Sequence, residues 1–164
     1  MRRPSLNRKF FTIGYTGFSL DEFIVRLNKS NIECLIDVRE IPCSRKRGFS
    51  KTALRERLEA SGIKYQHFRL LGSPRSLRHE VRKTEDFEKF FLGVSRHLSK
   101  ADSQIQVVDA IGLARHARSC LMCCCSDWRF CHRKCVVDEI LRSTFFFVEH
   151  LTKASVSSVH EKAA

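Results

Sequence analysis

Segments with the signature of β-strands alternate along this chain with segments that have helical spacing. Short apolar runs typical of strands lie at residues 10–15, 33–40, 64–70, 119–125 and 144–151. Between them, apolar residues recur at three- and four-residue spacing over residues 20–27, 50–62, 86–98, 104–118 and 131–142. This alternation predicts βαβ units, whose parallel strands form one sheet covered by helices on both faces. We therefore predict an α/β fold: a single-domain, Rossmann-like three-layer sandwich with a mainly parallel sheet of about five strands.

Local signals indicate where two helices begin and where one loop lies. Ser19 and Glu22 have the spacing of a capping box, and Ser50 is a candidate N-cap for the second helix. Gly72 and Pro74 indicate a loop that leads to the helix from residue 86. At 164 residues the chain is long enough for one core. We assign this core to residues 11–151, between a basic arm (1–10) and a polar tail (152–164).

The apolar runs also bear on location. None approaches the ~20 residues needed to cross a bilayer, and the basic N-terminus has no apolar segment of a signal peptide behind it. We therefore expect a cytoplasmic protein with no membrane partner. Its eight cysteines are then expected to be reduced thiols rather than disulfides.

The charge of the chain is strongly positive. Thirty Lys and Arg against eighteen Asp and Glu give a net charge of +12, and basic residues cluster at 45–47, 75–83 and 129–134. Such a field attracts polyanions, which favours nucleic acid or a phosphorylated small molecule as the partner. The alternative is a basic surface that is merely solvated.

Polar residues follow the predicted strands. Tyr15 and Thr16 end the first strand, Asp37 and Arg39 end the second, and His150 ends the last. The carboxyl ends of parallel strands share one edge of the sheet, and ligands of open α/β sheets bind there. Asp37 and Arg39 lie on the same face of their strand, so they form either a structural ion pair or an acid/base and anion-binding pair.

The most unusual segment is CLMCCCSDWRFCHRKC, residues 120–135, which holds six of the eight cysteines. Cys123 and Cys125 share a strand face, and Cys131 and Cys135 share a helix face, so four thiolates could converge on zinc. The spacing is not that of a standard zinc finger, however, and free cysteine usually packs as a small apolar residue. We therefore expect no bound metal and no cofactor.

Two other roles for this segment involve an anion or a reactive thiol. Cys123 and Arg129 have the C-x5-R spacing of phosphatase-like loops, although the intervening residues lack glycine. Cys131, His132 and Arg133 open a predicted helix, whose free N–H groups and dipole favour an anion and lower the pKa of a thiol. The alternative is a buried cysteine, a capping histidine and a surface arginine.

Taken in order, four motifs resemble those of a known family. They are TIGYTG (12–17), IDVREIPCSRKRGFSK (36–51), LLGSPR (70–75) and CCCSDWRFCHR (123–133). The chain resembles the family catalogued as domain of unknown function 488, and LIDVRE is also similar to the strand that opens many rhodanese domains. Where the family has a glutamate in C-x-E-x5-C-H-R, this chain has Cys125, and Ser73 replaces a glycine. The resemblance implies a shared site rather than a named reaction.

These observations lead to one predicted site and three function classes. The predicted catalytic residues are Asp37, Cys123 and His132, and the predicted ligand-binding residues are Tyr15, Thr16, Arg39, Cys131, Arg133 and His150. The first class is an enzyme with an anion-binding active site that acts on nucleic acid or a phosphorylated substrate. The alternatives are a thiol-dependent, sulfurtransferase-like enzyme and a non-catalytic nucleic-acid-binding module.

Overall fold

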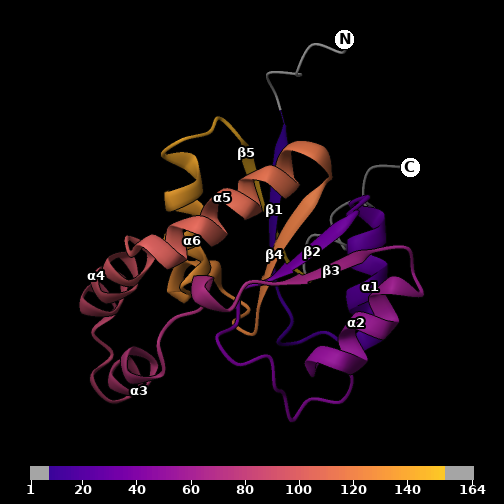
Figure 1. The fold of residues 1–164 in the computed structure, drawn as a ribbon. Helices are drawn as coiled ribbons and strands as arrows, with labels where there is room; N and C mark the ends of the chain where they lie inside the picture. Colours follow the sequence, from indigo (N-terminus) through magenta and orange to yellow (C-terminus); the bar gives the residue numbers. More distant parts are fainter. Residues whose placement is uncertain (1–7, 154–164) are drawn as a thin grey trace, which may run out of the picture.

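A computed structural model describes residues 8–153, and its centre is a sheet of five parallel strands (Figure 1). The strands are β1 (Lys9–Gly14), β2 (Cys34–Asp37), β3 (Lys64–His67), β4 (Ser119–Cys123) and β5 (Phe147–Leu151). Their order in the sheet is β3-β2-β4-β1-β5, and every neighbouring pair is parallel. The predicted parallel sheet of about five strands is confirmed.

Helices cover both faces of this sheet. In Figure 1, α1 (Leu20–Lys29) and α2 (Lys51–Glu59) lie on one side. On the other side lie α4 (Phe87–Leu98), α5 (Ala101–His116) and α6 (Arg133–Leu141). Each face has its own buried apolar cluster, built from the sheet and the helices on that side. The three-layer α/β arrangement is therefore confirmed.

The two predicted caps behave differently. Ser19 forms the expected capping box of α1: its hydroxyl accepts from the Glu22 N–H at 3.2 Å, and the Glu22 carboxylate accepts from the Ser19 N–H at 2.7 Å. Ser50 is the N-cap residue of α2, but its side chain makes no cap hydrogen bond. Its hydroxyl instead accepts from the N–H of Ser44 and donates to the Ser44 carbonyl, each at 3.1 Å, which holds the loop before α2.

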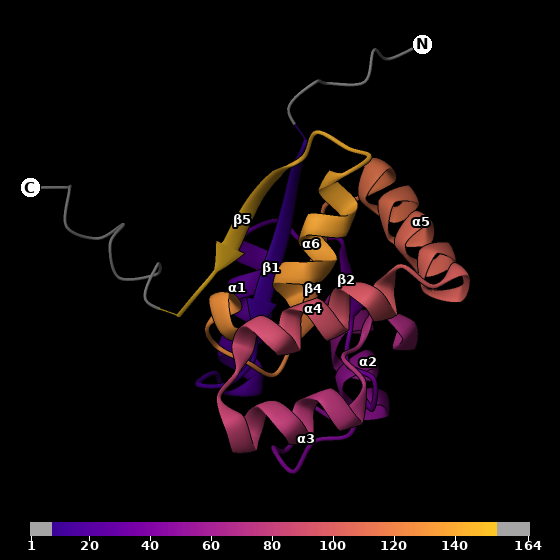
Figure 2. The same cartoon turned by 90° about the vertical axis from the view of Figure 1, so that its left-hand side faces the viewer.

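Several boundaries differ from the sequence prediction. The segment interpreted as a loop after Gly72 contains the helix α3 (Arg75–Thr84), which packs on α4 at the outside of the molecule (Figure 2). The strands β2, β3 and β4 end earlier than predicted, and β3 is followed by a short 3-10 turn, η1 (Arg69–Leu71). α6 begins two residues later than predicted, at Arg133, because a 3-10 turn, η2 (Trp128–Phe130), precedes it.

The ends of the predicted domain lie close to the described region. β1 begins at Lys9, so the last two residues of the predicted basic arm belong to the sheet, whereas 1–7 lie outside the described residues. Of the predicted polar tail, 154–164 also lie outside them. Within residues 8–153, no helix combines the length and the apolar character needed to cross a membrane.

The strand order places a crevice at one edge of the sheet. The chain leaves β1 and β2 toward the helices of one face, and leaves β4 toward α6 on the other face. Because β4 lies between β1 and β2, neighbouring strands send their connections to opposite faces. Such a switch point opens a crevice beyond the carboxyl ends of the strands, where ligands of these folds bind.

Candidate functional site: a thiol and imidazole cluster in one cavity

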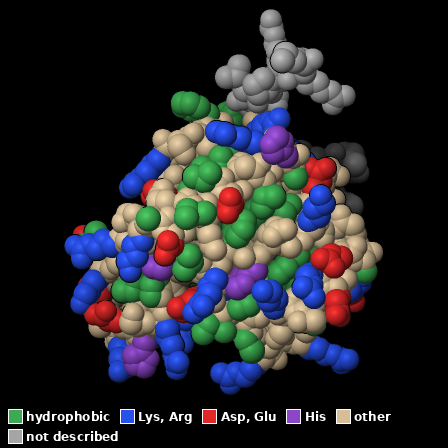
Figure 3. Space-filling view, viewed as in Figure 1, with side chains coloured by type: hydrophobic (Ala, Val, Ile, Leu, Met, Phe, Trp, Pro, Cys, Tyr) green, Lys and Arg blue, Asp and Glu red, His purple; other side chains and the backbone are tan. Residues whose placement is uncertain are grey.

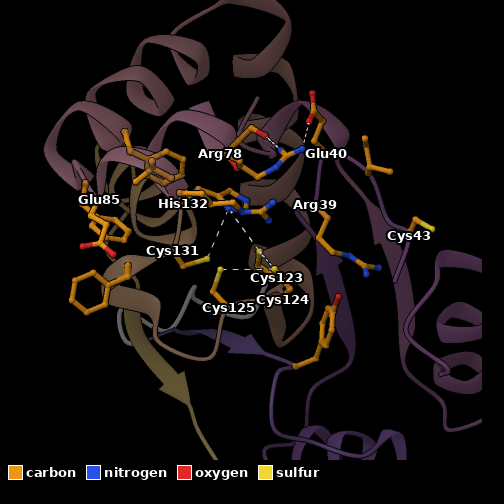
Figure 4. Close-up of a pocket in the computed structure, with 18 residues that line it drawn as sticks. Arg39, Glu40, Cys43, Arg78, Glu85, Cys123, Cys124, Cys125, Cys131 and His132 are labelled. Carbon is orange, nitrogen blue, oxygen red and sulfur yellow. Dashed lines mark hydrogen bonds and ion pairs between the residues drawn. The ribbon is translucent and has the colours of Figure 1, made fainter. Parts of the chain in front are cut away.

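A cavity of about 490 Å³ lies beyond the carboxyl ends of β1, β2 and β4 (Figure 4). This volume falls in the range of small-molecule sites. Five predicted site residues line the cavity: Tyr15, Arg39, Cys123, Cys131 and His132. The other four, Thr16, Asp37, Arg133 and His150, do not.

The floor of the cavity is fixed by a close approach of two chain segments. The N–H groups of Tyr15 and Thr16 donate to the carbonyls of Cys123 and Cys124 at 3.1 and 3.0 Å, so the pairing of β1 with β4 continues past the strand ends. A Cβ atom on Gly14 would lie only 1.7 Å from the Cys125 carbonyl oxygen. Glycine at position 14 therefore allows the cysteine loop to cross the end of β1.

Asp37 and Arg39 form the ion pair that their spacing suggested. The Asp37 carboxylate is fully buried and accepts from Arg39 Nη2 at 2.6 Å and from the Tyr65 hydroxyl at 2.6 Å. Burial raises the pKa of Tyr65, and the neighbouring Asp37 raises it further, so the phenol remains a donor. Arg39 also donates to the Phe49 carbonyl at 2.8 Å. Asp37 thus lies behind Arg39 and fixes the guanidinium at the cavity wall.

The thiols of Cys123 and Cys131 meet the imidazole of His132. Its Nδ1 lies 3.7 Å from Cys123 Sγ and 3.8 Å from Cys131 Sγ. Its Nε2 lies 2.8 Å from the Val38 carbonyl, which can only accept, so Nε2 carries a hydrogen. All three side chains are at least 95 % buried, and Figure 4 shows them pointing toward one another.

Mutual contacts shift the pKa values of this cluster in opposite directions. Burial acts to raise the pKa of Cys131, but hydrogen bonds from the Cys123 and Cys125 thiols and the charge of His132 outweigh it, so this pKa is lowered. The pKa of Cys123 is raised by its hydrogen bonds to neighbouring thiols and by burial. Burial acts to lower the pKa of His132, yet the adjacent Cys131 raises it.

Arg133 supports the cluster from inside the protein. It is 1 % exposed, and its Nε donates to Cys131 Sγ at 3.3 Å. Its Nη2 donates to the Cys125 carbonyl at 2.7 Å, and its Nη1 to the Thr12 hydroxyl at 3.3 Å. All of these contacts are internal, so its guanidinium faces the cysteine loop rather than the cavity.

The two remaining predicted residues lie outside the cavity. The side chain of Thr16 is exposed. His150 accepts or donates a 2.7 Å hydrogen bond between its Nδ1 and the Thr12 hydroxyl, and its ring stacks on Trp128 with centroids 3.9 Å apart. These contacts connect β5 to β1 and to the loop after β4.

Sequence reasoning missed the side of the cavity that α3 supplies. Arg78 donates to the Ser73 carbonyl and to the Glu40 carboxylate, the latter at 2.7 Å. Arg82 is exposed at the cavity, near Glu85. Aromatic side chains complete this side: Phe87, Phe90 and Phe130. The only sequence signal was a cluster of basic residues at 75–83. That cluster does not indicate which side chains point toward the cavity until the segment is known to be a helix.

Comparison with known proteins identifies the family alone. No curated protein and no solved structure matches this sequence. The family model for the domain of unknown function DUF488 matches residues 19–140, a range that includes the motifs at 36–51, 70–75 and 123–133 but not the one at 12–17. With most of the sheet, the cysteine loop and the start of α6 inside that match, the chain belongs to the DUF488 family.

Proposed function

We propose that this protein is an enzyme that acts on a small phosphorylated molecule bound in the cavity. One observation carries the proposal: arginine side chains and a thiol and imidazole cluster line the same 490 Å³ space. Arginine recognises phosphate oxygens through its fixed fork of donors. Thiol and imidazole groups are the usual side chains for nucleophilic and acid/base chemistry.

The charges around the cavity indicate where the anionic group binds. Arg39 is paired with Asp37, and Arg78 with Glu40, so these two guanidinium groups are largely compensated. Arg82 has no ion pair among the described residues and lies at the exposed side of the cavity. The nearby Glu85 opposes it. We assign the anion to the Arg82 side and the reacting part of the substrate to the side of His132.

In this proposal Asp37 is a positioning residue. It holds Arg39 against the cavity wall, while Tyr15 covers the same guanidinium with its ring face at 5.4 Å. Cys123, Cys131 and His132 are the groups that face the reacting atoms. The aromatic rings of Phe87, Phe90 and Phe130 offer an apolar surface to the rest of the substrate.

Binding of nucleoside monophosphates, pyrophosphate and inorganic phosphate tests the proposal by calorimetry. Arg82→Gln is expected to weaken binding by about 10- to 150-fold, since a hydrogen bond to a charged group contributes about 1.5–3 kcal/mol. Glu85→Gln is expected to strengthen it, because a repelling carboxylate is removed. Arg55→Gln on α2 makes the same charge change away from the cavity, and it controls for the effect of a lower net positive charge on anion binding. Equal effects of Arg82→Gln and Arg55→Gln would contradict an anion site in the cavity.

A second candidate function is thiol-dependent group transfer. It is favoured by the five cysteines that line the cavity, 43, 123, 124, 125 and 131. Here the Cys131 sulfur, contacted by the Arg133 guanidinium at 3.3 Å, forms a bond to the transferred group while the leaving group departs with its electron pair. Iodoacetamide labelling of the reduced protein, mapped by mass spectrometry, tests it. This candidate requires Cys131 to react faster than the exposed Cys43 despite its burial.

A further inference from the structure

Two thiols and one imidazole nitrogen converge within the cavity in a way that matches a single metal ion. Cys123 Sγ, Cys131 Sγ and His132 Nδ1 all lie within 4.8 Å of one another. We propose that these three residues bind a thiophilic divalent ion, with Zn²⁺ as the expected occupant and its fourth position open to the cavity. The proposal stands on this geometry alone and does not require the cavity to bind phosphate. With the ion bound, Cys123, Cys131 and His132 are its ligands and do not also act as nucleophile or as acid and base.

The separation of the donor atoms fits a tetrahedral ion. With Zn–S near 2.3 Å and Zn–N near 2.0–2.1 Å, tetrahedral angles place sulfur and nitrogen about 3.5 Å apart. The observed distances from His132 Nδ1 are 3.7 Å to Cys123 Sγ and 3.8 Å to Cys131 Sγ. Movements of a few tenths of an ångström therefore suffice for the two nitrogen–sulfur pairs, and the two sulfur atoms lie within 4.8 Å of each other. A mixed sulfur and nitrogen tetrahedron is the coordination that favours zinc.

The surroundings of His132 favour ligation through Nδ1. Its Nε2–H donates to the Val38 carbonyl at 2.8 Å, so the ring is held with Nδ1 directed at the two thiols. Metal-binding histidines characteristically donate their other ring N–H to a carbonyl or carboxylate. This contact also ties the ligand to the end of β2, an element far from His132 in sequence.

Cys131, like His132, has a hydrogen-bond partner that is not itself a proposed ligand of the ion. Arg133 Nε donates to Cys131 Sγ at 3.3 Å, as expected for a donor that stabilises a metal-bound thiolate. Arg133 also holds the Cys125 carbonyl at 2.7 Å, which fixes the loop that returns from Cys123. Three protein ligands with a fourth position toward a cavity is the arrangement of catalytic rather than structural zinc.

The cysteine spacing alone argued against a metal, because C-x-C-x5-C-x3-C is not the spacing of a standard zinc finger. Cys135 was paired with Cys131 on a helix face, but its thiol lies against the Phe91 carbonyl at 3.7 Å, outside the cluster. The proposed ligand set omits both Cys125 and Cys135 and includes the imidazole of His132, which a count of cysteines cannot reveal. A second group of thiols, 123 to 125, also lies within 4.8 Å, but it offers no nitrogen and includes the exposed Cys124.

Cobalt titration of the full chain tests the ligand set. Protein purified without chelator is analysed for zinc, then reduced, stripped of metal and titrated with Co²⁺, whose thiolate charge-transfer and ligand-field bands report tetrahedral sulfur coordination. One equivalent is expected for the wild type. Cys123→Ser, Cys131→Ser and His132→Gln should each weaken binding by more than the roughly 10–100-fold that loss of an outer-shell partner costs. Cys124→Ser and Cys43→Ser should bind normally.

His132→Gln is expected to keep the fold, because the glutamine amide can still donate to the Val38 carbonyl. Near-ultraviolet circular dichroism compares the packing of this variant with that of the wild type. Failure of reduced wild-type protein to bind Zn²⁺ or Co²⁺, or undiminished binding by both Cys131→Ser and His132→Gln, would overturn the proposal. If Cys124→Ser were the only variant that lost metal binding, the ion would belong to the group of thiols at 123–125, and the proposal would also be overturned. Phosphate binding is measured separately on metal-free and metal-loaded protein, so failure of the anion site leaves the metal result intact.

Discussion

Among the glycines of the chain, Gly14 has the least room for a side chain. Any side chain there would meet the Cys125 carbonyl oxygen, and a backbone atom cannot move aside cheaply. We expect Gly14→Ala to lower the free energy of unfolding by about 3 kcal/mol, at the upper end of the cost of overpacking. A methyl group on Gly112, inside α5, would meet only open space within 4 Å, so Gly112→Ala should instead stabilise by up to about 1 kcal/mol. Urea denaturation of both variants measures whether each substitution lowers or raises the free energy of unfolding.

The buried carboxylate of Asp37 gives a second residue-scale prediction. Asp37→Asn leaves the Arg39 guanidinium buried beside a neutral amide, and breaking a buried pair costs about 3–5 kcal/mol. Asp21→Asn removes the partner of Arg57 in an ion pair that is exposed on both sides, and its effect on stability should be much smaller. Similar denaturation midpoints for the two variants would show that Asp37 does not carry the structural role assigned to it.

At this scale, the sequence predicted which residues come together better than it predicted where each side chain points. The Asp37 and Arg39 pair follows from their two-residue spacing on a strand, and the meeting of Tyr15, Cys123 and His132 follows from parallel strand ends. The direction of Arg133 does not follow, because a helix start can present its arginine to solvent or to the interior. The contacts of Arg133 with Thr12 and Cys125 join residues from two distant segments, which no local pattern contains.

At the scale of elements, strand and helix type was predictable and their ends were not. The helix α3 was missed because Gly72 and Pro74 indicate a loop. Its polar composition also hides a short apolar stripe, Leu77 and Val81, that packs against the buried cluster beneath α4, α5 and α6. Gly72 itself is required by a tertiary contact: a Cβ there would lie 2.3 Å from the Glu40 nitrogen. Such contacts between distant segments leave no periodic signal in the sequence.

The attachment of the edge strand β5 should depend on pH through His150. Burial lowers the pKa of His150, and the positive charge of Arg133 lowers it further. Because Thr12 accepts from Arg133, its hydroxyl hydrogen is available to the neutral Nδ1 of His150. A histidine whose folded pKa lies below the unfolded value of about 6.5 loses its contribution as pH falls from that value through the folded pKa.

Trp128, the only tryptophan, reports on this directly because it stacks on the His150 ring. Its fluorescence in the folded protein should change with a midpoint below about 6.5, the value for an unperturbed histidine. The stability of the wild type relative to His150→Gln should decrease over the same window. A fluorescence transition that persists unchanged in His150→Gln would assign the titration to another group.

At the scale of the whole molecule, part of the net charge of +12 lies near the cavity. In Figure 3, Lys and Arg side chains gather over the region of α3 and along the lower edge, where the loop before α2 lies. The exposed basic residues of α3 include Arg75, Arg82 and Lys83, and those of the loop are Arg45 and Arg47. Both segments border the cavity through Arg82 and Cys43. A field of this kind would raise the local concentration of anionic substrates near the proposed site.

The same surface gives the last prediction, which separates a nucleic-acid-binding module from an enzyme for small molecules. If nucleic acid binds here, its affinity must fall steeply with salt, because bound phosphates release counterions. Replacing Arg45, Lys46 and Arg47 by Gln should then reduce the slope of log K against log salt by about 0.7 to 0.9 for each phosphate that the variant no longer neutralises. Labelled single- and double-stranded oligonucleotides, titrated at several salt concentrations, measure that slope.

The small-molecule enzyme predicts a different result for the same triple variant. Binding of a nucleoside monophosphate in the cavity should persist, because Arg82 and the cluster around His132 are untouched, and only its association rate should fall as the field weakens. Arg82→Gln should do the reverse: it weakens the binding of the monophosphate and leaves most of the salt-dependent oligonucleotide binding. Absence of oligonucleotide binding even at low salt, together with retained monophosphate binding, would restrict the function of the basic surface to steering small anions into the cavity.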